Sequence, residues 1–204
     1  MAGVGGVGVM IQGLSFHEVL ERILDYRAIA DPYLREKLRP GLTLEQIDKQ
    51  TRDLPFALPD EVKILYQWHD GTEEDWERHP LIGYHDFRPL EEVIERYLQL
   101  VEDFIDIDPE IAELLPLFEY ENEYYLSQCN AQQRNTGLIY SLYHDLTIEY
   151  DSLTSMFCAF LECYEIVALT PEGSPGHEKV INKQQVGEIK LKWNPIRERV
   201  YDHP

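Results

Sequence analysis

Basic residues are scarce in this sequence, which excludes some classes of partner. Its 204 residues include 18 lysines and arginines against 38 aspartates and glutamates, so the formal net charge is −20. A field of this sign repels phosphate backbones and anionic lipids, which argues against direct binding of nucleic acid or a membrane. It attracts basic proteins, although acidity also serves solubility alone in many proteins. A protein partner is therefore the class of partner that the charge favours.

Cysteine and long hydrophobic segments are scarce as well. Cys129, Cys158 and Cys163 are an odd number and include no CxxC pair, which favours a reducing compartment over a disulfide framework. No apolar run approaches the roughly 20 residues that cross a bilayer. The first residues have neither the basic part nor the sustained apolar part of a secretory signal. We therefore expect a cytoplasmic protein.

The one glycine-rich motif is out of context for nucleotide binding. Gly3, Gly5 and Gly8 have the GxGxxG spacing, but no strand precedes them and no capped helix opens at the last glycine. The phosphate-binding mechanism of that motif needs both elements. We therefore expect residues 1–13 to be a flexible leader.

The best candidate for a metal site is the window 69–86, where His69, His79 and His85 lie among several acidic residues. Imidazole and carboxylate groups suit zinc or another divalent ion. However, the window has no HxxxH or HExxH spacing, and a single histidine at a helix end is more often satisfied by a backbone carbonyl. We therefore expect no metal and no other cofactor.

A second group of polar residues, His144, Asp145, Asp151 and Ser152, has the residue types of a hydrolase. Ser152 lacks the GxSxG turn that would expose a nucleophilic hydroxyl. Asp151 or Ser152 serves more naturally as the N-cap of the helix that follows. We therefore expect no catalytic residue.

The best-defined element is a helix within Leu54–Gly71, around which the rest of the chain is expected to pack. Pro59 fits its first position, and Asp60 and Glu61 follow where the helix dipole favours anions. Gly71 is expected to take a left-handed conformation just past the helix end. Two apolar stripes leave little of the helix free to face water. They comprise Leu58, Val62, Leu65, Tyr66 and His69 on one side and Ile64 and Trp68 on the other.

Capping boxes open two earlier helices. Ser15 and Thr43 each precede a glutamate or glutamine three residues later, which is the pattern of reciprocal capping. Leu44 and Ile47 are expected on the inner side of the second helix. A turn or short helix lies between the two, ending before Pro40.

Two later helices follow from apolar periodicity, over residues 90–104 and from Ser152 to about residue 168. A final short helix is expected around Trp193–Arg199. The inner stripe of the first comprises Leu90, Val93, Ile94, Tyr97, Leu98, Val101 and Phe104 or Ile105.

Between these helices the pattern changes to short aromatic and β-branched runs. LPLFEY, EYYL, GLIYSLY and TIEY are separated by polar loops, as antiparallel strands are. The proline- and glycine-rich loop TPEGSPGHE is the one credible boundary near the C-terminus. We therefore expect one domain over residues 14–170 and a C-terminal extension, 171–204, docked on it.

Several of these segments together resemble the SUKH superfamily, which includes Smi/Knr-like cell-wall regulators and many bacterial proteins. The segments are LPDEVKILY, WHDG, LIGYHDF, PLEEVIE, LLPLFEYENEYYL and IEYDSLTSMFCAFLECYE, in that order. The resemblance spans roughly Leu14–Ala168, with Asp70 where members typically have asparagine. It implies an α+β fold in which several helices flank a small mixed or antiparallel sheet. Its structural motif residues are Leu58, Pro59, Leu65, Tyr66, Trp68, Gly71, Asp151, Ser152 and Leu153.

The resemblance implies a non-catalytic protein-binding module, of which two kinds are known in the family. One is an immunity-type protein that binds and neutralises a toxin, such as a basic nuclease; the other is a regulatory or scaffolding protein. An enzyme of unknown reaction is a third alternative. Exposed aromatics within an acidic rim are typical interface anchors. The candidate partner-binding residues are Glu73, Glu74, Asp75, Trp76 and Tyr84.

Overall fold

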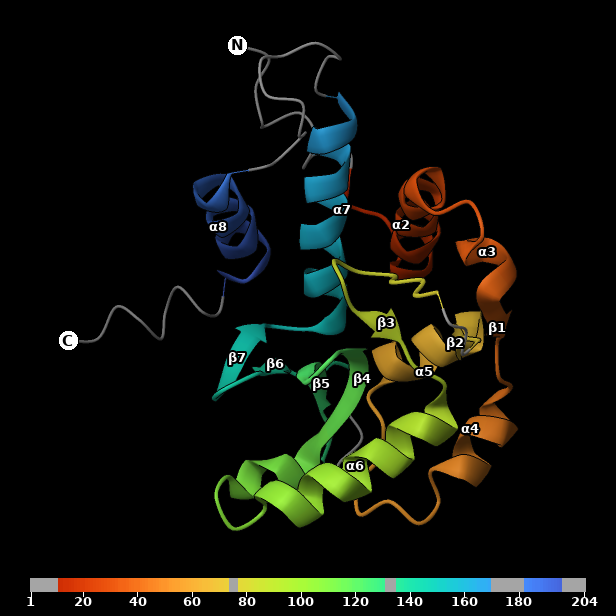
Figure 1. Cartoon of the computed structure of the whole chain (residues 1–204), viewed down its shortest axis with the longest axis vertical. Coiled ribbons are helices and arrows are strands. Elements are labelled where there is room, and N and C mark those ends of the chain that lie inside the picture. Colours follow the sequence, from red (N-terminus) through yellow and green to blue (C-terminus); the bar gives the residue numbers. More distant parts are fainter. Residues whose placement is uncertain (1–10, 74–76, 131–134, 170–181, 196–204) are drawn as a thin grey trace, which may run out of the picture.

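A five-stranded antiparallel sheet lies at the centre of the fold, with helices on both faces (Figure 1). The computed structural model describes residues 11–73, 77–130, 135–169 and 182–195. The α+β class is confirmed, and each described strand pair is antiparallel. The helices are α2 (Phe16–Ala30), α3 (Leu34–Lys37), α4 (Leu44–Gln50), α5 (Asp60–Trp68), α6 (Leu90–Phe104), the 3-10 helix η1 (Pro109–Glu113), α7 (Leu153–Leu169) and α8 (Lys183–Trp193). The strands are β1 (Leu38–Pro40), β2 (His69–Thr72), β3 (Asp86–Phe87), β4 (Leu114–Tyr120), β5 (Glu123–Gln128), β6 (Ile139–Leu142) and β7 (Leu146–Tyr150).

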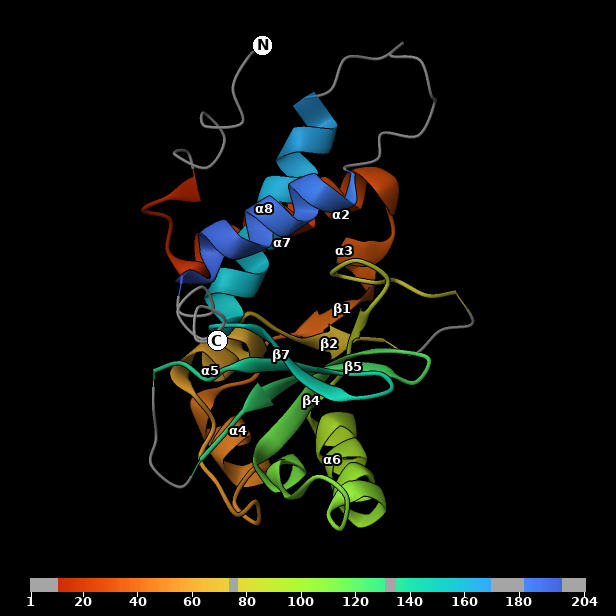
Figure 2. The same ribbon diagram turned by 90° about the vertical axis from the view of Figure 1, so that its left-hand side faces the viewer.

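Strand register brings three loops to one end of the sheet. The strands follow one another in the order β3-β4-β5-β6-β7. Asp86 pairs with Glu119, and Tyr124 pairs with Leu142, so the loop before β3 and the β4–β5 and β6–β7 turns lie together. Figure 2 shows both turns at the right of the view. We call this the hairpin end; it comprises residues 82–86, 120–123 and 143–145.

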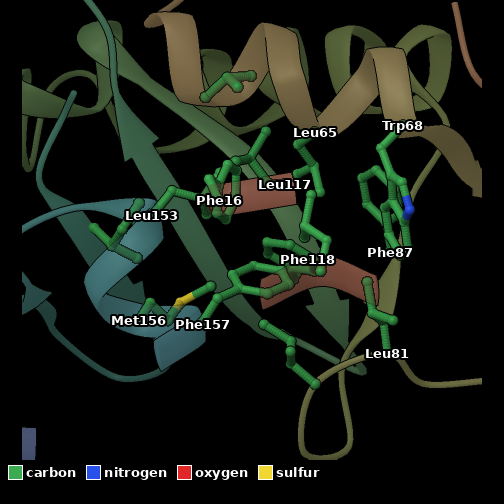
Figure 3. Close-up of a cluster of buried hydrophobic side chains, with 14 of the residues drawn as sticks. Phe16, Leu65, Trp68, Leu81, Phe87, Leu117, Phe118, Leu153, Met156 and Phe157 are labelled. Carbon is green, nitrogen blue, oxygen red and sulfur yellow. The ribbon is translucent and has the colours of Figure 1, made fainter. Parts of the chain in front are cut away.

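The two faces of the sheet bury separate hydrophobic clusters. The larger one lies between the sheet and helices α2, α5 and α7 (Figure 3). There the ring centroids of Phe118 and Phe157 are 5.8 Å apart, and those of Phe16 and Phe157 are 5.5 Å apart. The smaller cluster lies between the sheet and α6 with η1, and it includes Leu100 and Ile111. The sheet is therefore covered over its middle, whereas the hairpin end projects beyond the helices.

The capping boxes at Ser15 and Thr43 are confirmed, and the bounds of α6 are those predicted. The apolar stripes are narrower than predicted. Leu44 is 50% exposed, Ile64 37% and Leu98 59%, so the prediction that these three face the core was wrong. Each lies on the solvent side of a helix whose buried contacts are already made by neighbouring residues. Periodicity alone does not give the width of the covered face.

The end of α5 also differs from the prediction. Pro59 is the N-cap rather than the first helical residue, and His69 begins strand β2 instead of extending the helix. Gly71 has the expected positive φ of 74° but lies within β2 rather than just past the helix. A Cβ at Gly71 would lie 2.3 Å from the backbone nitrogen of Pro89. The glycine is therefore needed for close approach to the start of α6.

Helix α8 ends at Trp193 and packs on α7 (Figure 2). Most of the final helix predicted around Trp193–Arg199 lies outside the described residues, so it stays a prediction. The Glu162 carboxylate, on α7, is 0% exposed and lies 2.7 Å and 2.8 Å from the Lys192 ammonium. Trp193 Nε1 donates to the same carboxylate at 2.5 Å. Residues 1–10, 170–181 and 196–204 lie outside the described part, so the boundaries of the leader, domain and extension stay predictions. Among the described residues, no helix has both the length and the apolar character needed to cross a bilayer.

Candidate protein-binding site

A buried carboxylate of the LPDEVKILY motif sits at the start of α7. Glu61, on α5, is 8% exposed and accepts hydrogen bonds from the backbone N–H groups of Leu153 at 3.1 Å and Thr154 at 3.3 Å. The Thr154 hydroxyl also donates to it. Burial raises the pKa of Glu61, and the bonds from Thr154 and Leu153 oppose that rise. Because the first N–H groups of a helix have no partner within it, Glu61 joins α5 to α7 as a structural group.

A second motif carboxylate does the same for α6. Asp70 is buried, accepts a hydrogen bond from Leu90 N–H at 2.9 Å, and lies 3.1 Å from the Arg39 guanidinium. Burial raises its pKa, against the opposing effects of the Leu90 bond and of Arg39. Aspartate in place of asparagine thus adds an ion pair while keeping the helix cap. The WHDG segment is accounted for by folding rather than chemistry.

Two of the three candidate metal ligands have separate polar partners. His69 Nδ1 lies 2.8 Å from the backbone carbonyl oxygen of Arg39. His79 is buried, and its Nδ1 lies 2.7 Å from a carboxylate oxygen of Asp31, which fixes the loop before β3 to the end of α2. The two imidazoles therefore have separate structural roles, with His69 joining β2 to β1 and His79 holding the loop before β3.

The third histidine, His85, packs among aromatic rings at the hairpin end. Its ring centroid lies 4.5 Å from that of Tyr125. Burial, together with a smaller effect of the nearby Arg78, lowers the pKa of His85 to about 4. Across the part of the chain that the structure describes, no group of three or more His, Cys, Asp or Glu side chains is arranged to hold a metal ion.

The four residues with hydrolase chemistry are not brought together. Ser152 Oγ accepts a hydrogen bond from Ser155 N–H at 3.0 Å, and Ser155 Oγ accepts one from Ser152 N–H at 3.0 Å, as in a helix N-cap. His144 and Asp145 are exposed at the opposite end of β7. Asp151 N–H donates to the Asn194 side chain at 2.8 Å. This arrangement provides capping but no base beside the serine.

The three free cysteines are poor nucleophiles for the same physical reason. Burial raises the pKa of Cys158 to about 12 and of Cys163 to about 11, and it raises that of Cys129 as well. The thiolate is the reactive form of cysteine. At neutral pH all three are therefore protonated thiols, buried in Cys129 and Cys158 and partly buried in Cys163.

Exposed tyrosines distinguish the hairpin end from the rest of the sheet. Tyr84 is 74% exposed and Tyr143 is 59% exposed. The ring of Tyr84 lies beside that of the half-buried Tyr120, with centroids 5.8 Å apart. By contrast, Trp68 and Tyr124 are core residues. Tyrosine is common in interfaces because it presents a large rigid ring with a polar tip.

One guanidinium group holds this corner of the sheet together. Arg78 donates to the Asp86 carboxylate at 2.7 Å and 2.8 Å, and to the backbone carbonyls of Tyr84 at 3.1 Å and Glu119 at 3.3 Å. It also lies 4.6 Å from the centre of the Tyr120 ring. Because its Nε and Nη2 groups donate within the chain, Arg78 fixes the loop that carries Tyr84.

Acidic side chains surround the tyrosines. The three loops of the hairpin end contain no lysine or arginine. Glu121 has a positive φ of 53°, a left-handed conformation that glycine or asparagine adopts at lower cost. A charged residue therefore occupies a turn position that folding alone would assign to another type. The carboxylates of the hairpin end are Asp86, Glu121, Glu123 and Asp145.

The predicted partner-binding residues are only partly placed by the structure. Glu73 and Tyr84 are both exposed. Glu74, Asp75 and Trp76 lie outside the described residues, so their role stays a prediction. Sequence analysis missed Glu121 and Tyr143, although counting strand register from turn to turn would have placed both turns at one end of the sheet.

Residues 41–163 match the SMI1 / KNR4 family (SUKH-1). The chain belongs to this family. None of the curated proteins matches it. The SMI1/KNR4 match contains α4, α5, α6, both motif carboxylates, the whole five-stranded sheet and therefore the hairpin end. It does not include α2 or α8, both of which pack against α7.

Proposed function

We propose that this SMI1/KNR4-family chain is a non-catalytic protein-binding module, and that it is an immunity-type protein which neutralises a basic toxin. The partner docks on the hairpin end. The observation that carries the proposal is the combination of exposed Tyr84 and Tyr143 with four carboxylates in the three loops, of which Asp86 is paired with Arg78.

The hairpin end suits docking because its side chains are held before the partner arrives. Tyr84 and Tyr120 lie on segments fixed by β3–β4 pairing and by Arg78. Ordering mobile side chains opposes association, so aromatic rings on rigid turns lose less entropy on binding. Tyr84 and Tyr143 are therefore the expected anchors of the interface.

The negative charge of the chain favours basic partners. A net charge of −20 accelerates the encounter with a positively charged protein, and the effect decreases with ionic strength. If the toxin is a nuclease, its cleft must itself bind phosphate groups. The carboxylates of the hairpin end would then occupy that cleft and exclude the nucleic acid by charge and by volume.

The test is calorimetric titration of the purified chain with the basic proteins encoded next to its gene. We expect a 1:1 complex that weakens when salt is raised from about 50 mM to about 300 mM, because screening shortens the range of charge attraction. Replacing Tyr84 and Tyr143 together with alanine should weaken the complex by about 30-fold or more, as for two anchor residues.

The matched control is Tyr33→Ala, which removes a tyrosine that is 60% exposed outside the hairpin end. It should leave the affinity unchanged. A complex that does not inhibit the partner would support the regulatory alternative of the family instead of immunity. An equal effect of the control and of the double variant would overturn the hairpin end as the docking surface.

A further inference from the structure

A small polar pocket lies between α6 and β4, on the opposite face of the sheet from Tyr84 and Tyr120. Its volume is about 130 Å³, enough for roughly four water molecules or the end of one long side chain. Its charged lining comprises two arginines and three glutamates: Arg88, Arg96, Glu92, Glu95 and Glu119.

The charges in the pocket are fixed but do not balance. Arg96 Nη2 lies 3.3 Å from the Glu119 carboxylate, and Arg88 lies 2.6 Å from Glu92 and 3.9 Å from Glu119. Glu95 is exposed and forms no ion pair with any residue that the structure describes. Three carboxylates thus face two guanidinium groups, and the pocket lacks one positive charge.

We infer that this pocket binds a lysine or arginine side chain of the protein partner. This inference rests on the proposed function and names the residue type that the partner inserts. A cationic guest would pair with Glu95 and bring the pocket to three charges of each sign. An anionic guest would have to displace Glu119 from Arg96 and enter against the field of the whole chain.

The pocket is joined to the hairpin end through one residue. The backbone carbonyl of Glu119 accepts the hydrogen bond from Arg78 at 3.3 Å, while its side chain lines the pocket. Successive residues of a strand point to opposite faces, so Glu119 faces the pocket and Tyr120 faces Tyr84. A partner that covers the β3–β4 corner can therefore contact the tyrosines and place a basic side chain in the pocket.

The probe is Nα-acetyl-L-arginine amide, titrated into the isotopically labelled full chain and followed by NMR. We expect saturable binding, with a dissociation constant on the order of millimolar for so small a ligand, seen at the Arg96 Nε–H and Gln99 amide signals. Glu95→Gln should weaken binding about two- to fivefold, which is the range for an exposed ion pair.

One control tests whether the charge of the ligand matters, and a second tests whether the position of the carboxylate matters. Nα-acetyl-L-citrulline amide has nearly the same shape without the positive charge and should not bind. Glu102→Gln makes the same change of charge on an exposed residue of α6 outside the pocket and should leave binding unchanged. Equal binding of both amides, or equal effects of the two variants, would overturn the inference.

A failure of the pocket inference can be distinguished from a failure of the proposed function by comparing two variants. If Glu95→Gln leaves the affinity for the protein partner unchanged while the Tyr84 and Tyr143 double variant weakens it, the partner docks without using the pocket. If neither variant matters, the hairpin end itself is not the interface.

Discussion

The carboxylate of Glu61 accepts a hydrogen bond from the backbone N–H of Leu153, 92 positions later in the chain, at a distance of 3.1 Å. Asp70 forms the equivalent contact with Leu90 at 2.9 Å. Two acidic residues of the family motifs therefore fix the start of α7 against α5 and the start of α6 against β2. Because α6 and α7 cover the two faces of the sheet, these caps hold the hairpin end in a constant position relative to the core.

Glu61→Ala should destabilise the chain by about 2 kcal/mol, because it leaves two helix N–H groups buried without an acceptor. Chemical denaturation measures the loss. Glu102→Ala is the control, since Glu102 is exposed on α6 and should cost less than about 0.5 kcal/mol. Equal losses in the two variants would contradict the structural role given to Glu61.

The same carboxylate should impose a pH dependence. Its pKa is raised in the native state, so the folded chain retains a proton where the unfolded chain has lost it. Stability should therefore fall as pH rises from the unfolded pKa of about 4.5 through the native pKa. Glu61→Gln, which does not titrate, should show a smaller fall over that range. An unchanged slope would mean that Glu61 is not desolvated as described.

Gly71→Ala should destabilise the chain by more than about 2 kcal/mol. The residue has a positive φ, and the new methyl group would meet the backbone of Pro89. Gly187→Ala is the matched control, because no atom lies within 4 Å of its added Cβ and it lies within α8. That variant should gain about 0.5–1 kcal/mol. Thermal melts of both variants should show a lower melting temperature for Gly71→Ala and a higher one for Gly187→Ala.

His85 should stay neutral in the folded chain until the pH reaches about 4. The unfolded chain takes up that proton near pH 6.5, so stability should fall as pH drops from about 6.5 to about 4. His85→Phe keeps a ring beside Tyr125 and removes the titration, so it should lose less stability over this range. The imidazole signals in an NMR titration give the pKa itself, and a value near 6.5 would contradict the packing described.

Glu121→Gly should stabilise the chain and weaken the partner complex at the same time. Glycine adopts the left-handed conformation of this turn without strain, which predicts a gain of about 1 kcal/mol. The lost carboxylate should weaken binding to a basic protein, mainly by slowing association. A thermal melt of this variant tests the gain in stability, and a kinetic binding measurement tests the slower association. Glu110→Gly, at an exposed position of η1 away from the hairpin end, should not slow association.

Local patterns in the sequence were sufficient for some elements and not for others. The bounds of α6 follow from apolar spacing, and the capping boxes at Ser15 and Thr43 each involve residues only three positions apart. By contrast, β1, β2 and β3 are two to four residues long and form only because distant segments pair, as Asp86 does with Glu119. Such pairings leave no periodic signal in a short run.

The sequence predicted the types of residue in the candidate site but not their position in the fold. The acidity and the choice of Tyr84 as a candidate interface residue follow from the sequence. Tyr143 is placed at the same end of the sheet only by the register of three strand pairs, β3–β4, β4–β5 and β5–β6. The roles of Glu61 and Asp70 were also out of reach. In the sequence, Glu61 reads as a first-turn residue of its own helix and Asp70 as the neighbour of Gly71. Only the fold shows that each caps a helix that begins far along the chain.

The most direct test of docking at the hairpin end is amide hydrogen exchange of the chain alone and in complex with its basic partner. We expect slower exchange in the complex at residues 82–86, 120–123 and 143–145, with little change in α8 or at the end of α2. Protection confined to those helices, with exchange at the hairpin end unchanged, would contradict it.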